Sequence, residues 1–297
     1  QKAKLYAWEK LLRQSLASGH VDANRLYVFG ISEGGYGSQR LASYYADYWA
    51  GVGPMAGGEP LKNAPVENCA NLAFSFLTGA MDEGFYRNKL TGYTKTAFDS
   101  LQAKYAGRLM NHSADSLFRH RIELIPNCGH SIDYSLTTPW LKNYKRNPYP
   151  HTFLWEDYPM DGQRRQGFYN LYVMKRPKAA DGLKDASGED RDYYEMDIQD
   201  NVIRLSVKKV TYQTLERDPV YGIDLKFTKS YHPVIGGKWK IYLNDQLVDM
   251  NRPVTVFIND RKAFEGKLVP RMEDMITSCM EYFDPCRVFP ASVDVAL

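Results

Sequence analysis

The sequence has few of the features that mark membrane, metal-binding or nucleic-acid-binding proteins. It contains four cysteines with no CxxC spacing, which argues against a zinc site or a redox dithiol. No apolar run approaches the roughly 20 residues of a membrane span, and the start QKAKLYAWEK lacks a signal-peptide core. The formal net charge is only +3, and no basic run is long. We therefore expect no cofactor, no metal, no nucleic-acid partner and no membrane span.

The remaining composition is that of a globular protein. Of the 297 residues, 44% are hydrophobic and 25% are charged, which is enough to fill one large domain or two ordinary ones. We find no internal repeat of fixed period. Buried thiols are expected rather than a disulfide, and any disulfide that forms is expected to join Cys279 and Cys286; the other cysteines are Cys69 and Cys128.

Residues 1 to 150 alternate helical patterns with short apolar runs. Buried strands are indicated by RLYVFG, WAGVGPMAGG, NLAFSFLTG and HRIELIP. Helices are indicated by KLYAWEKLLRQSL, KTAFDSLQAKY and TTPWLKNYK. Alternation of this kind predicts an α/β layer with parallel strands.

Residues 151 to 297 change to a period of two. Strands are indicated by RDYYEMDIQ, NVIRLSVKKVTY, IDLKFTKSY, KWKIYLND and PVTVFIND, separated by Gly, Asn, Asp and Pro turns. The polar segment KRPKAADGLKDASGEDRD favours a mobile loop, and PRMEDMITSCMEYF favours a helix. The second half therefore reads as a mostly antiparallel β module, expected to be a small sandwich.

A serine stands between the first apolar strand and the helix that follows it, in Gly30-Ile31-Ser32-Glu33-Gly34. Such a serine can be a plain turn residue, or a nucleophile on a strained strand-to-helix elbow. An activated serine needs a base and a third group that orients the base. In a parallel sheet these groups follow the carboxyl ends of strands. Asp82 follows NLAFSFLTGAM, and His130 follows HRIELIPNCG.

With GISEGG, TGAMDEGF and PNCGHS in this order, each after its own strand, the sequence resembles the α/β-hydrolase family. The resemblance implies that Ser32 is the nucleophile, that His130 is the general base and then the acid, and that Asp82 orients His130. It also implies that the backbone N–H of Glu33 is one oxyanion donor. Gly34 and Gly35 are expected where a Cβ would clash with the elbow strand.

Other residues could take these roles. Glu59 follows GPMAGG, where some family members carry the acid. Asp133 is too near His130 in the sequence, and Glu83 would point away if Asp82 points in. The remaining histidines are expected at the surface, at a strand start or in loops of the second half, so a metal cluster would need distant segments to converge: His20, His112, His120, His151 and His232.

The resemblance also exposes a missing segment. Only about 25 residues precede the elbow strand, and they read as one helix. The family places several strands there, and a loop that supplies the second oxyanion donor. We therefore expect a piece of a longer protein, with the elbow strand at an exposed sheet edge and weak activity. The resemblance suggests a periplasmic or secreted location.

The second half resembles the C-terminal β extension of esterase-like hydrolases related to polyhydroxybutyrate depolymerases and feruloyl or acetyl esterases. Its aromatic residues are expected to be scaffold core rather than a docking surface for carbohydrate or polymer: Trp155, Tyr158, Phe168, Tyr169 and Tyr172. Together the features predict a serine hydrolase that cleaves small-molecule or polymer-linked carboxylic esters through an acyl-enzyme. The alternatives are a peptidase of the prolyl oligopeptidase type and a non-catalytic binding protein on a hydrolase scaffold.

Overall fold

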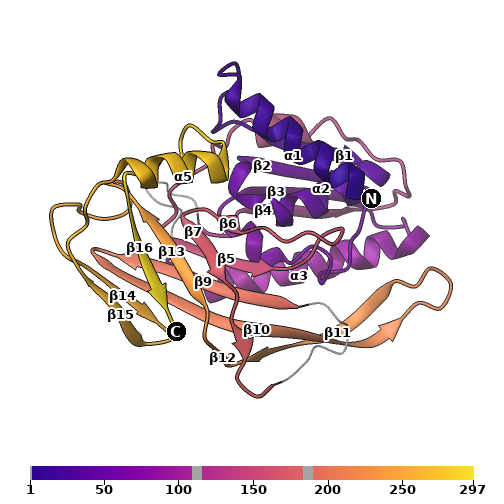
Figure 1. Ribbon diagram of the computed structural model, residues 1–297. Coiled ribbons are helices and arrows are strands. Elements are labelled where there is room, and N and C mark those ends of the chain that lie inside the picture. The colour runs from indigo at the N-terminus through magenta and orange to yellow at the C-terminus, as the bar shows by residue number, and fades with distance from the viewer. Residues whose placement is uncertain (1, 109–115, 183–189) are drawn as a thin grey trace. The chain divides into compact units, whose positions relative to one another are not determined.

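The computed structural model describes residues 2–108, 116–182 and 190–297 (Figure 1). It is a mixed α/β protein with one parallel sheet and several mainly antiparallel sheets. Its chain divides into two compact units, here called the α/β unit (Asn24–Asn147 and Tyr212–Thr228) and the β unit (Gln1–Ala23, Pro148–Thr211 and Lys229–Leu297). Most of the chain before residue 148 belongs to the α/β unit, and most of the chain after it belongs to the β unit. Two segments are exceptions: residues 1–23 group with the β unit, and residues 212–228 group with the α/β unit.

The α/β unit is built on the four strands that the apolar runs predict. They are parallel and lie side by side in sequence order (Figure 1): β1 (Tyr27–Ile31), β2 (Gly51–Met55), β3 (Ala73–Gly79) and β4 (His120–Ile125). Every residue of β2 and β3 is buried, which explains why both read as continuous apolar runs. The connecting helices are α2 (Glu33–Tyr44), α3 (Arg87–Lys104) and α4 (Thr137–Leu141), with the short 3-10 turns η1 (Ala46–Tyr48), η2 (Val66–Cys69) and η3 (Gly84–Tyr86).

Helix α3 begins eight residues before the predicted segment, which starts at Lys95. Its early turns are polar, so apolar periodicity does not mark them. Their buried face carries Thr91, whose hydroxyl lies 2.9 Å from that of Thr78 in β3. A buried hydroxyl pair thus replaces the apolar contact that a sequence pattern would detect.

Strand β1 lies at the edge of the four-stranded sheet, as predicted for the elbow strand. Within the described residues, no strand pairs with its outer side. Phe29 and Ile31 on this strand are 51% and 45% exposed, so two large apolar side chains of the edge strand face solvent.

The other described strands form three sheets, which lie mainly in the β unit. The six-stranded sheet has the order β15 (Arg261–Gly266), β14 (Val254–Ile258), β10 (Val202–Arg217), β9 (Arg191–Gln199) and β5 (Thr152–Asp157), with β11 (Asp224–His232) paired to β10. The four-stranded sheet has the order β16 (Ala291–Ala296), β13 (Lys238–Leu243), β7 (Leu171–Lys175) and β6 (Gly167–Phe168), and β12 (Val234–Ile235) pairs with β8 (Lys178–Ala179). Of these pairs, β10 with β14 is parallel, whereas β9 with β5 and β10, β14 with β15, β13 with β16 and β7, β7 with β6, and β8 with β12 are antiparallel. Strands β10 and β11 are joined by the short link of residues 218–223 and form a hairpin.

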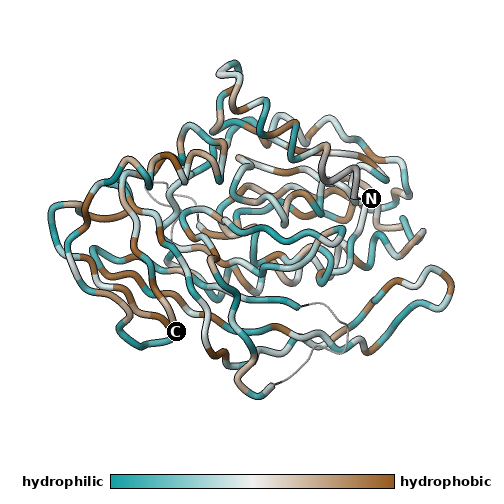
Figure 2. The backbone as a smooth tube through the Cα atoms, viewed as in Figure 1, coloured by the Kyte–Doolittle hydropathy of each residue, from teal (hydrophilic) through white to brown (hydrophobic). Residues whose placement is uncertain are grey.

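Hydrophobic and hydrophilic residues alternate along much of the long strand β10 (Figure 2), and in its first half buried positions recur every second residue from Ile203 to Lys209. Helix α1 (Lys2–Ala17) groups with this unit, and the Arg13 guanidinium lies 4.9 Å from the ring centre of Phe283, just after helix α5 (Met272–Tyr282). Part of the predicted mobile loop, residues 183–189, lies outside the described residues.

Aromatic side chains join the two larger sheets of the β unit. Trp155 of β5 stacks on Phe168 of β6 with ring centres 5.2 Å apart, and Tyr194 of β9 meets Trp239 of β13 at 6.3 Å. Of the aromatic residues singled out in the sequence, Trp155, Tyr158, Phe168 and Tyr169 are buried, and Tyr172 is half-buried. The scaffold interpretation is therefore right for the four buried rings, and the docking-surface alternative is wrong for them.

All four cysteines are free thiols, so the alternative of a disulfide between Cys279 and Cys286 is wrong. The prediction of buried thiols holds fully only for Cys69. Burial raises the pKa of the Cys69 thiol, and the nearby Glu67 carboxylate adds to this effect. Cys128 and Cys286 are half-buried, and Cys279 is exposed on the solvent side of α5.

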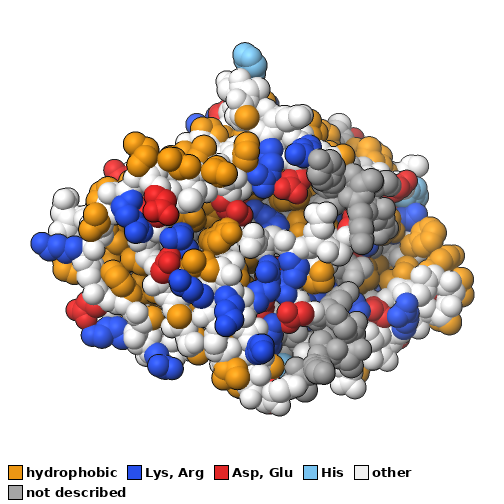
Figure 3. All heavy atoms as spheres, in the orientation of Figure 1, with side chains coloured by type: hydrophobic (Ala, Val, Ile, Leu, Met, Phe, Trp, Pro, Cys, Tyr) orange, Lys and Arg blue, Asp and Glu red, His pale blue; other side chains and the backbone are white. Residues whose placement is uncertain are grey.

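On the face seen in Figure 3, acidic and basic side chains are interspersed with hydrophobic ones. This mixture accords with the small formal net charge of +3. None of the helices in the described part of the chain is long and apolar enough to cross a bilayer.

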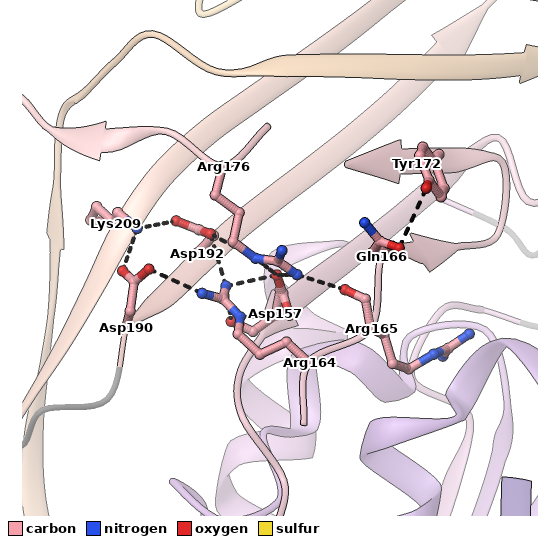
Figure 4. Close-up of polar contacts among 9 residues, drawn as sticks. All are labelled: Asp157, Arg164, Arg165, Gln166, Tyr172, Arg176, Asp190, Asp192 and Lys209. Carbon is pink, nitrogen blue, oxygen red and sulfur yellow. Dashed lines mark hydrogen bonds and ion pairs between the residues drawn. The ribbon is translucent and has the colours of Figure 1, made fainter. Parts of the chain in front are cut away.

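Charged side chains are also gathered inside the β unit (Figure 4), in a network of Asp157, Asp190, Asp192, Arg164, Arg176 and Lys209. Arg164 lies at its centre, with nitrogen atoms 2.7 Å from Asp157, 2.8 Å from Asp192 and 3.1 Å from Asp190. Burial raises the pKa of Asp192, although Arg164 and Lys209 act against it. The buried carboxylates Asp157 and Asp192 therefore depend on Arg164 for compensation.

Replacing the central arginine, as Arg164→Leu, is expected to lower the free energy of unfolding by about 3–5 kcal/mol, because it leaves buried carboxylates without their main cation. The matched control is Lys262→Gln, which removes an exposed ion pair of 2.6 Å with Glu265 and is expected to cost less than about 1 kcal/mol. Urea unfolding of both variants measures the difference. Equal losses in the two variants would contradict this role of the network.

Candidate active site

Ser32 lies at the sharp turn between β1 and α2. Its backbone has φ 57° and ψ −114°, a conformation that side-chain-bearing residues rarely adopt. Its N–H donates to the Met55 carbonyl of β2 at 2.9 Å, and its own carbonyl accepts the N–H of Gly35 at 2.9 Å and of Tyr36 at 3.2 Å. The turn is thus fixed on both sides, and it holds the serine in a strained conformation of the kind found at functional sites.

Two glycines make this turn possible. A Cβ on Gly30 would lie 2.4 Å from the Gly34 carbonyl oxygen, and a Cβ on Gly35 would lie 2.4 Å from the Met55 carbonyl oxygen. The predicted need for glycine is confirmed at Gly35, although the neighbour that a Cβ would strike is β2 and not the elbow strand β1. It is wrong for Gly34, where an added Cβ meets nothing within 4 Å. At that position the backbone carbonyl, not the missing side chain, lies close to β1.

The loops that carry Asp82 and His130 follow β3 and β4 and are bonded to each other. The N–H of Ala80 donates to the Ile125 carbonyl, and that of Met81 to the Cys128 carbonyl, both at 2.9 Å. A Cβ on Gly79 would lie only 1.9 Å from the Gly129 carbonyl oxygen. The close approach of these backbones places the acid and the histidine side by side at the carboxyl end of the sheet.

The structure brings together the three side chains predicted from the sequence. The Ser32 Oγ lies 3.0 Å from His130 Nε2, and His130 Nδ1 lies 2.7 Å from Asp82 Oδ2. A carboxylate can only accept, so Nδ1 carries the proton toward Asp82, and Nε2 is left to accept the serine O–H. The Asp82 side chain is 4% exposed and the His130 side chain is 44% exposed. The acid is therefore shielded from water, whereas the imidazole is accessible.

Three further residues that the sequence did not single out hold this arrangement. Arg87 Nη1 lies 3.2 Å from Asp82 Oδ1, and the N–H of Asn88 donates to the Asp82 carbonyl at 3.0 Å. The Tyr134 hydroxyl donates to the His130 carbonyl at 2.9 Å. No local pattern marks Arg87 among the 38 Lys and Arg residues of the chain, because its contact depends on an unusual turn between it and Asp82.

The alternative acids are engaged elsewhere or face solvent. Buried Glu59 accepts from Arg40 at 2.7 Å and from Asn63 at 3.0 Å. Asp133 accepts the Ser135 N–H at 2.9 Å, and its hydrogen bonds with Ser135 lower its pKa. Glu83 is exposed.

The remaining histidines do not gather. His20 is exposed and His120 begins β4, as predicted, with Nε2 2.9 Å from Asp99. His151 and His232 lie in the β unit, and His112 lies outside the described residues. No group of three or more His, Cys, Asp or Glu side chains in the described part of the chain could hold a metal ion.

Comparison with known proteins gives little beyond the geometry. The chain matches no family model and no curated protein sequence. A crystal structure of a thermostable esterase is similar over 48% of this chain and 36% of that chain, with 18% identity and a TM-score of 0.34. The chain thus spans just over a third of the length of that esterase, and a TM-score this low carries no argument about activity.

The elbow glycines offer a matched pair of variants. Gly35→Ala is expected to lower the free energy of unfolding by about 1–3 kcal/mol, because its Cβ would press on the β2 backbone. Gly34→Ala is expected to be neutral or to stabilise α2 by up to about 1 kcal/mol, because its Cβ would meet open space. Thermal or urea unfolding compares the two. An equal loss in both variants would show that the close approach at Gly35 is unimportant.

Proposed function

We propose that the protein is a serine hydrolase that cleaves carboxylic esters through an acyl-enzyme on Ser32. The observation that carries the proposal is the unbroken hydrogen-bond chain from Ser32 through His130 to Asp82, at 3.0 and 2.7 Å. The strained backbone of Ser32 and the order serine, acid, histidine along parallel strands add support. On this proposal, β1–β4 correspond to part of an α/β-hydrolase sheet.

The proposed chemistry follows from the positions of the protons. Ser32 Oγ attacks the ester carbonyl carbon while His130 Nε2 takes the proton of the serine hydroxyl. Asp82 stabilises the imidazolium that forms. The imidazolium then gives its proton to the leaving alkoxide, which departs as the alcohol and leaves the acyl group on Ser32. A water molecule, deprotonated by His130, then attacks the acyl carbonyl; the bond to Ser32 Oγ breaks, the imidazolium returns its proton to Oγ, and the carboxylic acid is released.

The developing oxyanion needs hydrogen-bond donors. Glu33 is the first residue of α2, so its backbone N–H lies at a helix N-terminus, beside the nucleophile. Backbone N–H groups at such a terminus, together with the helix dipole, stabilise negative charge. We assign the Glu33 N–H as one oxyanion donor, with no catalytic role for its side chain.

An ester is favoured over a peptide bond on chemical grounds. An alkoxide can leave a tetrahedral intermediate without prior protonation, whereas the nitrogen of a peptide must be protonated before it leaves, so ester cleavage asks less of the catalytic groups. The substrate class we propose is a small-molecule or polymer-linked carboxylic ester.

The nucleophile is tested with a fluorophosphonate probe and a p-nitrophenyl ester. We expect the probe to label Ser32, and Ser32→Ala to lower turnover by about 10⁴-fold or more. Ser100→Ala is the control, because Ser100 is an exposed serine on α3 that donates to the Thr96 carbonyl. Failure of the folded protein to label at Ser32 would favour a non-catalytic binding protein. Faster cleavage of a matched p-nitroanilide would favour a peptidase.

The acid is tested by comparing two conservative variants. Asp82→Asn is expected to lower kcat by about 10⁴-fold, because an amide that donates to Nδ1 would favour the wrong histidine tautomer. Glu59→Gln, which changes the alternative acid, is expected to leave kcat per folded molecule within a few fold, since Glu59 contacts Arg40 instead. Steady-state kinetics on both proteins decides between them. The reverse pattern would assign the acid to Glu59.

A further inference from the structure

The segment between Asp82 and α3 contains two consecutive aromatic residues in the left-handed region. Phe85 has φ 53° and ψ 25°, and Tyr86 has φ 59° and ψ 29°. Bulky residues rarely adopt this conformation, and each costs about 1–3 kcal/mol. Such a turn persists only where surrounding contacts hold it.

Those contacts come from residues more than 130 positions away, at the tip of the β10–β11 hairpin. The Tyr86 hydroxyl donates to Asp218 Oδ1 at 2.9 Å, and the rings of Phe85 and Tyr221 lie 4.5 Å apart. Asp218 is only 5% exposed, and its other carboxylate oxygen accepts the N–H of Tyr221. The backbone N–H of Asp218 donates to Ile223 at 2.8 Å, which closes the tip on itself.

This hairpin tip belongs to the same compact unit as the candidate site. The bases of β10 and β11 lie in the β unit, whereas residues Tyr212–Thr228 group with the α/β unit. Within that unit, Phe85, Tyr86 and Tyr221 line one surface cavity of about 830 Å³. The hairpin tip therefore packs on the segment between Asp82 and α3, here called the acid loop.

The strained turn leads directly to the cation that contacts the acid. Arg87 follows Tyr86, and its guanidinium lies 5.3 Å from the ring centre of Phe85. Arg87 donates to the Gly84 carbonyl at 2.7 Å and to Asp82 Oδ1 at 3.2 Å. This leaves Oδ2 of Asp82 directed to His130 at 2.7 Å. The position of the Phe85–Tyr86 turn thus determines where Arg87 can hold the carboxylate.

We propose that the β10–β11 hairpin tip is a positioning element for Asp82, with Asp218 and Tyr221 holding the Phe85–Tyr86 turn that places Arg87 against the acid. The proposal rests on the proposed function for its catalytic consequence, but its geometric part stands on these contacts. Neither Asp218 nor Tyr221 touches the serine or the histidine. Their effect passes through the orientation of one carboxylate, and small displacements of catalytic groups have large effects on rate.

The kinetic test uses Tyr86→Phe and Asp218→Ala, with rates expressed per site titrated by fluorophosphonate. We expect each to lower kcat by about 10- to 100-fold with little change in KM. Asp218→Asn retains an oxygen that accepts the Tyr86 hydroxyl, and we expect it to restore most of the rate. Because the two residues act through one hydrogen bond, the double variant is expected to lose little more than either single one.

The matched control is Glu216→Gln on the same hairpin. It removes an exposed ion pair of 2.6 Å with Lys226 but leaves the hydrogen bond between Tyr86 and Asp218 in place, and we expect no change in kcat. If Tyr86→Phe and Asp218→Ala lower the unfolding temperature but leave kcat per titrated site unchanged, the tip is only a structural contact and the proposal is overturned.

A second readout does not depend on activity. The His130 Nδ1 proton bound to Asp82 is expected to give a downfield proton NMR signal, assigned by its loss in His130→Gln. We expect the signal to exchange faster with water in Tyr86→Phe and Asp218→Ala, and to be retained in Asp218→Asn and Glu216→Gln. An identical signal in all four variants overturns the positioning role. If the wild-type protein hydrolyses no ester, the proposed function fails, and this signal still decides the positioning proposal.

Discussion

The buried carboxylate of Asp82 is the group on which the arrangement of the α/β unit depends. Its side chain is 4% exposed, so it must be compensated inside the protein. One oxygen faces His130 at 2.7 Å and the other faces Arg87 at 3.2 Å. Two separate parts of the chain therefore have to meet around one ion, and the parallel sheet makes that possible because the loops after β3 and β4 leave it at the same edge.

The close approach of these loops requires backbone conformations and spacings that few residue types tolerate. A side chain at Gly79 would overlap the Gly129 carbonyl. At the elbow, a side chain at Gly30 would overlap the Gly34 carbonyl, and one at Gly35 would overlap the Met55 carbonyl. Ser32, Phe85 and Tyr86 have positive φ without being glycine. These three residues flank the candidate site, and the contacts that hold Tyr86 extend to the hairpin tip at Asp218.

Much of this could be predicted from the sequence because its signals are local. Four apolar runs marked β1–β4, and the residues after three of them supplied Ser32, Asp82 and His130. The turn at Phe85 and Tyr86 has no such signal, because aromatic residues are not typical of positive φ. The contact between Tyr86 and Asp218 joins residues 132 positions apart, so no spacing rule could suggest it. Arg87 was missed for the same reason, since only that turn brings its guanidinium to Asp82.

The β unit gives the complementary lesson. Period-two alternation predicted most of its longer strands but not β5 or β16, and the Arg164 network, which joins several segments, has no counterpart in any local pattern. The elbow gives an example at the level of single residues. The sequence suggested that a Cβ would clash at both Gly34 and Gly35, whereas in the structure only a Cβ on Gly35 would clash with a neighbouring backbone. Sequence patterns locate elements, and distances between elements decide which residues in them are constrained.

The central claim is that Ser32 is a nucleophile activated by His130 beside an oxyanion donor at the start of α2. A crystal structure of the protein after reaction with a fluorophosphonate tests it most directly. The account predicts phosphorus bonded to Ser32 Oγ, with a phosphoryl oxygen about 2.7–3.1 Å from the Glu33 backbone nitrogen. An adduct on another residue, or a phosphoryl oxygen turned away from the N-terminus of α2, would contradict it.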